Sequence, residues 1–391
     1  MRDVYLIGVG QTKMTKNAGI RGRYMAEEAI EKAVAHAGID WKQIGMLVAG
    51  NMTAGRLTHQ QQLGALHADV VGLRGIEAAT VEAACGSGAA ATRWGVMSVG
   101  GGYHDVVLIC GSERMTHAAL DDTTAALATA ADWELEGING ESFISLNARL
   151  MRRYMHTYRV SAQDFGHFAI TAHDNGFTNP NGFLHKKIDM ETYLNSRMLV
   201  DPVKLLDAPP VCDGAAAVVL ATEEVARAVA HSNGLPLIRI AGSAIGTDSL
   251  ALDSRRDMMV LDGAVLSTRR AMEQAGVKHE DIDIFELHDA YTIITTLSLE
   301  AAGFAEKGKG VHFGKEGEIT LTGKLPIATF GGLKSRGHPV GATGVFQLVE
   351  TYMQLTGTAG ENQVPDPEFA LVQNIGGTGA TVISHVLQRC S

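Results

Sequence analysis

The sequence predicts an α/β protein that contains the same structural unit twice. Buried strand-like runs alternate with segments of helical spacing, which is typical of mostly parallel sheets covered by helices on both faces. Residues 31–39 (EKAVAHAGI) match residues 269–277 (RRAMEQAGV) at a constant offset of 238 (269 − 31), and each copy leads into a strand. Glycine supplies 45 of the 391 residues, which suits tight turns and close contacts between helices and sheets.

The first copy begins with a buried strand at 4–10, followed by a helix over 25–37 that ends at Gly38. Strands are predicted at 44–50 and 104–111, and between them a helix starts directly after Cys85. A strand of small residues at 213–220 and a helix to about Ala230 return to this first lobe. His231 to Gly234 is the predicted linker to the second copy.

The second copy repeats these elements in the same order. Its predicted strands are 238–242, 282–287 and 370–376, and the helix after His338 is the counterpart of the helix after Cys85. We therefore expect an N-terminal half of residues 1–118 plus 205–230 and a C-terminal half of residues 235–391.

Residues 119–204 interrupt the repeat and form a predicted cap. They contain Trp133, a helix from Ser142 to Tyr158 and the turn sequence NPNG at 179–182. An insertion of this length beside an active site commonly binds substrate. We expect it to line the substrate tunnel and to contribute to a dimer contact.

The composition excludes several classes of protein. The formal net charge of −10, from 33 basic and 43 acidic residues, argues against a nucleic-acid partner. No apolar run reaches membrane-spanning length and no signal peptide precedes the first strand, so a soluble, cytoplasmic protein without a membrane partner is expected. The cysteines show no metal-ligand spacing and predict reduced thiols without a metal; they are Cys85, Cys110, Cys212 and Cys390.

Cys85 is the strongest candidate for a reactive residue. It stands among small residues (VEAACGSGAA) at a predicted helix start, where the helix dipole and free N–H groups favour the thiolate. A lone cysteine is more often a buried structural residue. Two distant stretches argue for chemistry instead, namely ELHDAY at 286–291 and GGLKSRGHPVGATG at 331–344, which supply His288 and His338.

Together, the Cys85 stretch, HDAY and GHPVGATG resemble the thiolase superfamily over nearly the whole chain, in particular the bacterial and archaeal branch related to sterol-carrier-protein thiolases. The resemblance implies a five-layered αβαβα sandwich of two βαβαβαββ halves with an inserted cap. It also implies coenzyme A thioesters as substrates, coenzyme A as a substrate and not a permanently bound cofactor, and a covalent acyl–cysteine intermediate.

The resemblance also assigns roles to the site residues. Cys85 is the expected nucleophile and His338 the base that takes its proton. His288 stands where many thiolases carry Asn and is expected to help hold the thioester oxygen. The backbone N–H groups of Cys85 and Gly376 are expected to form a second oxyanion site. Residues that contact coenzyme A are not assigned, because Lys334 and Arg336 in the GHP loop are as readily explained as solvated cations.

One departure from the family pattern concerns proton transfer at the α-carbon. The second catalytic cysteine of thiolases is replaced by Asn374 at one of its usual places and by Ala290 at the other. The acid–base work then falls to His288, His338, Tyr291 or a bound water. We expect His338 to support acylation and His288 to support the α-carbon chemistry.

The leading functional hypothesis is an acyl-CoA C-acyltransferase that cleaves a 3-oxoacyl-CoA with coenzyme A, or runs the reverse Claisen condensation. Ala290 leaves room near the α-carbon, so the substrate is acetoacetyl-CoA-like or a bulky 2-acylsuccinyl-CoA such as benzoylsuccinyl-CoA. Alternatives are a decarboxylating ketosynthase-like or aldolase-like homologue, and a non-catalytic lipid carrier or scaffold subunit. Expected assemblies are a homodimer or dimer of dimers, and a hetero-oligomer with a small zinc-ribbon/OB-fold protein.

Overall fold

Both halves of the chain build sheets with the same strand order. The computed structural model describes residues 2–16 and 19–390. The first half contributes the order β3-β2-β4-β7-β1 and the second the order β9-β10-β11-β8. Beside β9, Ile327 bridges Phe285 in parallel and takes the place that β3 holds in the first half. This matching order confirms the predicted duplication.

The bounds of the first half follow the predicted elements closely. Its strands and helices are β1 (Val4–Gln11), α1 (Gly22–Ala37), β2 (Met46–Gly50), α2 (Ala54–Leu57), α3 (Leu63–Val70), β3 (Glu77–Val81), α4 (Ser87–Gly101), β4 (Val106–Glu113), β7 (Gly214–Thr222) and α9 (Glu223–Asn233). Helix α1 ends at Gly38, whose left-handed backbone (φ 64°) returns N–H bonds to the last turn. Since α9 continues to Asn233, the predicted linker at 231–234 is too early, and the connection to β8 is residues 234–236.

The second half has the same alternation. Its elements are β8 (Leu237–Thr247), α10 (Asp262–Ala275), β9 (Ile284–Glu286), α11 (Thr292–Ala301), α12 (Gly310–Lys315), α13 (Thr343–Leu355), β10 (Phe369–Gly376) and β11 (Thr381–Cys390). At the junction of the two halves, Tyr5 and Leu6 of β1 pair with Arg239 and Ile238 of β8, so the strands form one continuous nine-stranded sheet.

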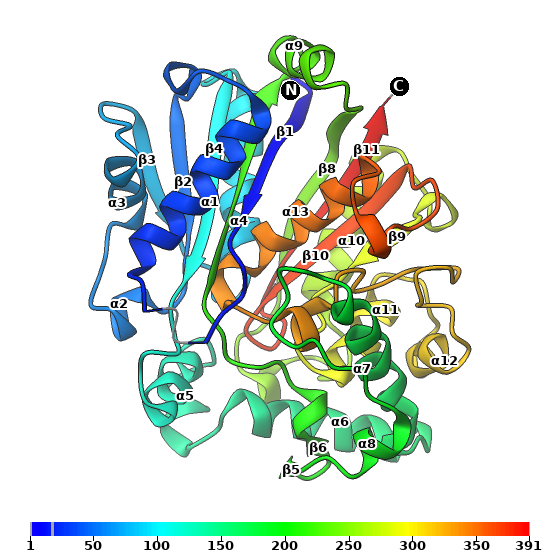
Figure 1. Ribbon diagram of the computed structural model, residues 1–391. Helices are drawn as coiled ribbons and strands as arrows, with labels where there is room; N and C mark the ends of the chain where they lie inside the picture. The colour runs from blue at the N-terminus through cyan, green and yellow to red at the C-terminus, as the bar shows by residue number, and fades with distance from the viewer. Residues whose placement is uncertain (1, 17–18, 391) are drawn as a thin grey trace.

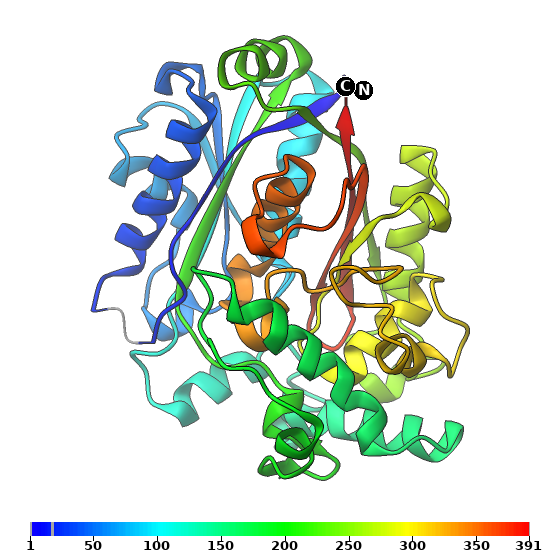
Figure 2. The same ribbon diagram turned by 45° about the vertical axis from the view of Figure 1, so that its right-hand side comes forward.

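Helices separate and cover the two parts of this sheet, giving the predicted αβαβα layers. Figures 1 and 2 show α4 and α13 between the two sheet halves, α1 and α3 outside the first, and α10 outside the second. The central helices approach closely because glycines face each other's backbone. A Cβ atom at Gly344 would lie 2.4 Å from the Ala89 nitrogen, and one at Gly88 would lie 3.0 Å from the Val345 nitrogen.

The prediction of mostly parallel sheets is wrong. Of the eight pairings that the structure describes in the large sheet, three are parallel (β2 with β3, β2 with β4, β9 with β10) and five are antiparallel (β1 with β7, β1 with β8, β4 with β7, β8 with β11, β10 with β11). A short turn joins β10 to β11 and permits only an antiparallel pair. Buried strands read as continuous apolar runs in either direction, so the sequence pattern does not distinguish them.

The segment between β4 and β7 folds as a group of helices at one end of the sandwich (Figures 1 and 2). Its elements are α5 (Leu120–Ala128), α6 (Phe143–Tyr158), α7 (Ala162–Phe177), α8 (Met190–Leu194), β5 (Met198–Val200) and β6 (Val203–Lys204). Helix α6 begins after Ser142, whose hydroxyl accepts from the Ser145 N–H.

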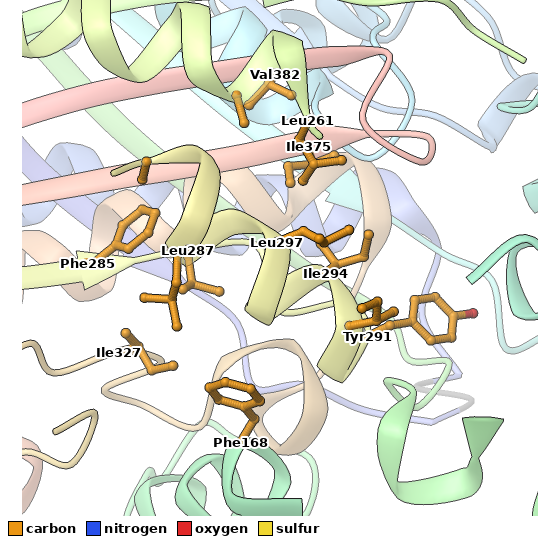
Figure 3. Packing of buried hydrophobic residues seen from close by; sticks show 14 of the residues in the cluster. Phe168, Leu261, Phe285, Leu287, Tyr291, Ile294, Leu297, Ile327, Ile375 and Val382 are labelled. Carbon is orange, nitrogen blue, oxygen red and sulfur yellow. The ribbon is translucent and has the colours of Figure 1, made fainter. Parts of the chain in front are cut away.

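This segment shares the hydrophobic core of the second half. Figure 3 shows Phe168 of α7 beside Ile327 and below Leu287 and Leu297, and all four belong to one buried cluster. Burial of such side chains stabilises the fold by about 1.5–3 kcal/mol each, so α7 is firmly fixed to the second half. None of the helices in the described part of the chain is both long and apolar enough to cross a membrane.

Candidate active site

Cys85 lies on a tight turn between β3 and α4. Ala84, directly before it, has a left-handed backbone (φ 52°), which costs an alanine roughly 1–2 kcal/mol. The turn is held by bonds from the Gly86 N–H to the Ala83 oxygen (2.9 Å) and from the Ser87 hydroxyl to the Ala84 oxygen (2.6 Å). This strained turn fixes the direction of the Cys85 side chain.

The three predicted catalytic side chains line one cavity of about 370 Å³. Cys85 comes from the first half, and His288 and His338 come from the second. Helices α5 and α6 contribute much of the apolar wall, including Leu127, Phe143 and Ile144, and Arg197 also lines the cavity. The remaining wall near the histidines includes Ala290, Tyr291, Ile294, Ile375 and Gly377. Figure 3 shows Ile294 between Tyr291 and Ile375.

The Cys85 thiol is neutral in this structure. Burial raises its pKa to about 12, with a further contribution from the Glu113 carboxylate, while the backbone N–H groups of Cys85 and Gly377 act in the opposite direction. The expectation that the helix start favours a thiolate is therefore wrong for the free protein. Cys85 precedes the first residue of α4 by two positions, and only 7% of it is exposed.

His338 is a neutral imidazole that lines the same cavity as Cys85. Its Nδ1 lies 2.7 Å from the Thr343 Oγ1, on the first residue of α13. Burial, His288 and Arg336 together hold its pKa well below the usual value of 6.5. When Nδ1–H donates to Thr343, the unprotonated Nε2 is available to accept a proton.

His288 lies directly beyond β9 and packs against His338. The two ring centroids are 5.1 Å apart and the rings are nearly perpendicular, at 80°. Burial lowers the His288 pKa to about 3, assisted by Arg336 and Lys334 and opposed by Asp289. The His288 Nδ1 lies 2.9 Å from the side-chain nitrogen of Asn374, which stands on β10.

The loop after β10 brings backbone N–H groups to the cavity. The prediction selected the N–H of Gly376, and the N–H of the next residue, Gly377, also lies near Cys85, where it acts to lower the pKa of the thiol. Gly377 lines the cavity and has a left-handed backbone (φ 63°). Sequence reasoning missed it, although the Gly-Gly pair at 376–377 was the available signal.

Glu113 is a second residue that sequence reasoning missed. Its buried carboxylate accepts bonds from the N–H groups of Met52 (3.0 Å), Thr53 (3.1 Å) and Gly341 (3.0 Å), and from the Asn51 and Thr53 side chains. The Met52 sulfur lies 3.9 Å from Cys85 Sγ. Glu113 therefore joins the loop beside the cysteine to the loop that carries His338. Its only sequence signal was its place at the end of a buried strand.

The other charged residues of the GHP loop are structural. Lys334 and Arg336 are each 1% exposed, so they are not available for coenzyme A phosphates. The Lys334 Nζ lies 3.3 Å from Asp289 Oδ2, and Arg336 forms a buried ion pair with Glu350. Asp289 also accepts the Leu333 N–H at 2.7 Å, so its carboxylate fixes this loop.

Burial, with a smaller contribution from the neighbouring Cys85, raises the pKa of the Tyr291 phenol far above its ordinary value. Across residues 2–16 and 19–390, no group of three or more His, Cys, Asp or Glu side chains is arranged to hold a metal ion.

Comparison with known proteins agrees with this architecture. Residues 4–224 match the thiolase N-terminal domain, and residues 244–389 match the "Thiolase C-terminal domain-like" family. The chain is 39% identical to an acetyl-CoA acetyltransferase of Methanothermobacter thermautotrophicus over 100% of both chains. It is 31% identical to the benzoylsuccinyl-CoA thiolase subunit BbsB of Thauera aromatica, covering 96% of this chain and 95% of the relative.

A solved structure described as an Ltp2-ChsH2(DUF35) aldolase superimposes with a TM-score of 0.86 at 25% identity, covering 99% of this chain and 98% of that one.

The duplicated αβαβα sandwich and the two family matches define the class of the protein, which is that of the acyl-transferring thiolase enzymes. The chain belongs to the thiolase family and is an acyltransferase.

Proposed function

We propose that this thiolase cleaves a 3-oxoacyl-CoA with coenzyme A, or catalyses the reverse Claisen condensation, through an acyl–Cys85 intermediate. The observation that carries the proposal is the convergence of Cys85, His288 and His338 on one cavity, with a neutral thiol and neutral imidazoles. A neutral imidazole can accept the thiol proton when the nucleophile attacks.

In the cleavage direction, His338 takes the proton from Cys85 and the sulfur bonds to the C3 carbonyl carbon of the substrate. The C2–C3 bond then breaks, leaving the acyl group on Cys85, and the proton is delivered to C2 to give the acetyl-CoA-type product. A coenzyme A thiol next attacks the acyl–cysteine, and its proton returns to Cys85. Negative charge develops on the C3 oxygen when the sulfur attacks and on the thioester oxygen of the enolate that leaves. His288 and the N–H groups of Cys85, Gly376 and Gly377 are the proposed donors to these oxygens.

Acetoacetyl-CoA or a close analogue is the leading substrate. The 39% identity to an acetyl-CoA acetyltransferase over the entire chain supports it. A bulky 2-acylsuccinyl-CoA such as benzoylsuccinyl-CoA is the second candidate, favoured by the small Ala290 in the cavity wall and by the apolar lining from the cap. In either case coenzyme A is a substrate, and the reaction requires no permanently bound cofactor.

An aldolase-like function is the alternative suggested by the structural neighbour described as an aldolase. Cys85 argues against it, because aldol cleavage does not need a thiol nucleophile. A ketosynthase-like decarboxylation would use the same Cys–His–His set. The buried, prearranged set argues against a lipid carrier or scaffold.

We further propose a homodimer that forms along β3, whose outer edge is unpaired in the described sheet. The neighbouring Trp94 and Met97 are 48% and 41% exposed. Light scattering should then give at least twice the chain mass of 41.5 kDa.

We also propose a division of the chain into an N-terminal half (1–118 plus 205–230), a cap (119–204) and a C-terminal half (235–391), and a cytoplasmic location for the protein. The last proposal is a zinc-ribbon/OB-fold partner protein, which the DUF35-containing structural neighbour suggests.

Thiolysis of acetoacetyl-CoA by coenzyme A tests the function directly. The purified protein should consume acetoacetyl-CoA and form acetyl-CoA, while the Cys85→Ala variant should lose essentially all turnover. Benzoylsuccinyl-CoA, assayed in parallel, separates the two substrate classes. Acetoacetyl-CoA turnover equal to wild type in Cys85→Ala would refute the acyl–cysteine route.

A further inference from the structure

We propose that Asn374 is a positioning residue that fixes the tautomer of His288, so that His288 donates a hydrogen bond to the substrate and does not act as a base. The inference rests on the proposed thiolase function. It assigns a role to the residue that stands where the family pattern places its second cysteine.

The geometry fixes the direction of the hydrogen bond. Asn374 is fully buried on β10, and its Nδ2 lies 2.9 Å from His288 Nδ1. An amide nitrogen can only donate, so Nδ1 accepts. A neutral imidazole carries one proton, and with Nδ1 as the acceptor that proton is on Nε2.

The surroundings of the amide favour this orientation. Asn374 Oδ1 has no hydrogen-bond partner among the described residues. It packs toward Gly344, where a Cβ atom would come within 2.5 Å of it. Reversing the amide would leave its NH₂ group without an acceptor there, and buried N–H groups without a partner are rarer in proteins than under-satisfied oxygens.

The two histidines therefore have roles that differ from those expected from the sequence. With Nδ1 occupied by Asn374 and Nε2 protonated, His288 has no free lone pair for a proton from the α-carbon. It instead presents an N–H group, which can stabilise negative charge on a thioester oxygen. Proton transfer at both sulfur and carbon then falls to His338, whose Nδ1 contacts the hydroxyl of Thr343 and not an amide.

Nitrogen NMR of protein labelled with ¹⁵N in the histidine rings tests the tautomer without turnover. His288, assigned by its loss in His288→Ala, should show a protonated Nε2 and an unprotonated Nδ1. In Asn374→Asp the carboxylate only accepts, so the proton should appear on Nδ1. A wild-type signal with the proton on Nδ1, or an unchanged pattern in Asn374→Asp, would overturn the inference. Because this readout needs no substrate, it is independent of the proposed reaction.

Steady-state kinetics of variants provide a second test of the role of His288. Asn374→Asp should lower kcat roughly 100- to 1,000-fold, the usual loss for one oxyanion donor, with little change in KM. His288→Asn keeps a side-chain N–H donor but no imidazole base. It should therefore retain clearly more activity than His288→Ala. Equal loss in His288→Asn and His288→Ala would show that the imidazole acts as a base.

Discussion

The Cys85 and His338 side chains line one cavity and are both neutral, and their neutrality follows from burial. Removing a thiolate from water costs more than a nearby helix start restores, so the Cys85 pKa rises to about 12. The same burial, with His288 and Arg336 nearby, holds the His338 pKa well below 6.5. We therefore expect the proton to stay on the Cys85 sulfur until the carbonyl of a substrate is in place for attack.

The protonation state of the Cys85 thiol can be tested by the ultraviolet absorbance that a thiolate has and a thiol lacks. The difference spectrum between wild type and Cys85→Ala should show no thiolate titration between about pH 6 and pH 9, because the raised pKa lies above that range. Acylation should be flat over the same range and decline only in acid, when His338 is protonated. A thiolate step below pH 8 would instead indicate an ion pair of the kind found at cysteine-protease sites.

At the residue scale, the sequence motifs predicted Cys85, His288 and His338, and the structure brings all three to one cavity. Their roles stay predictions. Glu113 and Gly377 were not predicted, because both act through contacts between segments that are far apart in the sequence. Asn374 was noticed only as the replacement of a cysteine, since its contact with His288 depends on how β10 lies beside β9.

At the scale of elements, the central helices α4 and α13 are held together by small residues. Gly344 of α13 approaches both the backbone of Ala89 and the Asn374 amide. The helices begin on equivalent turns of the two halves, one after Cys85 and the other after His338. Close packing of this helix pair therefore places the thiol and the imidazole at the same end of the sandwich.

Substituting Gly344→Ala should damage both stability and activity. The added Cβ would meet the Ala89 nitrogen at 2.4 Å and Asn374 Oδ1 at 2.5 Å, and overpacking of this kind costs about 1–3 kcal/mol. Denaturant unfolding should show the loss, and kcat should fall because Asn374 is displaced. Gly22→Ala is a matched control, since its nearest neighbour is the Arg114 Cβ at 3.9 Å. Equal unfolding free energies for the two variants would contradict the packing account.

Strand direction is the feature of the elements that the sequence predicted poorly. The positions of β1, β4, β7 and β10 follow from apolar runs bounded by glycine and acidic residues. Their direction depends on the connection each strand uses. β7 enters the sheet only after the inserted cap and lies antiparallel between β1 and β4. That long-range return leaves no local pattern in the sequence.

At the scale of the whole molecule, the duplication divides the chemistry between two similar halves. The first half supplies the thiol and the second supplies both imidazoles, while the cap closes the apolar side of the cavity. The internal match over 31–39 and 269–277 was enough to predict this duplication. The nine-stranded continuity through β1 and β8 was not predictable, because it depends on how the two halves meet.

The most direct test of the account is to locate the acyl group on the protein. Wild-type protein incubated with acetoacetyl-CoA, quenched in acid and digested should carry an acyl mass on the peptide that contains Cys85. His338→Ala should carry little or none, because no neighbouring base remains to take the thiol proton. His288→Asn, which keeps an N–H donor, should still be acylated. An acyl mass on Cys110, Cys212 or Cys390 with none on Cys85 would contradict the central claim.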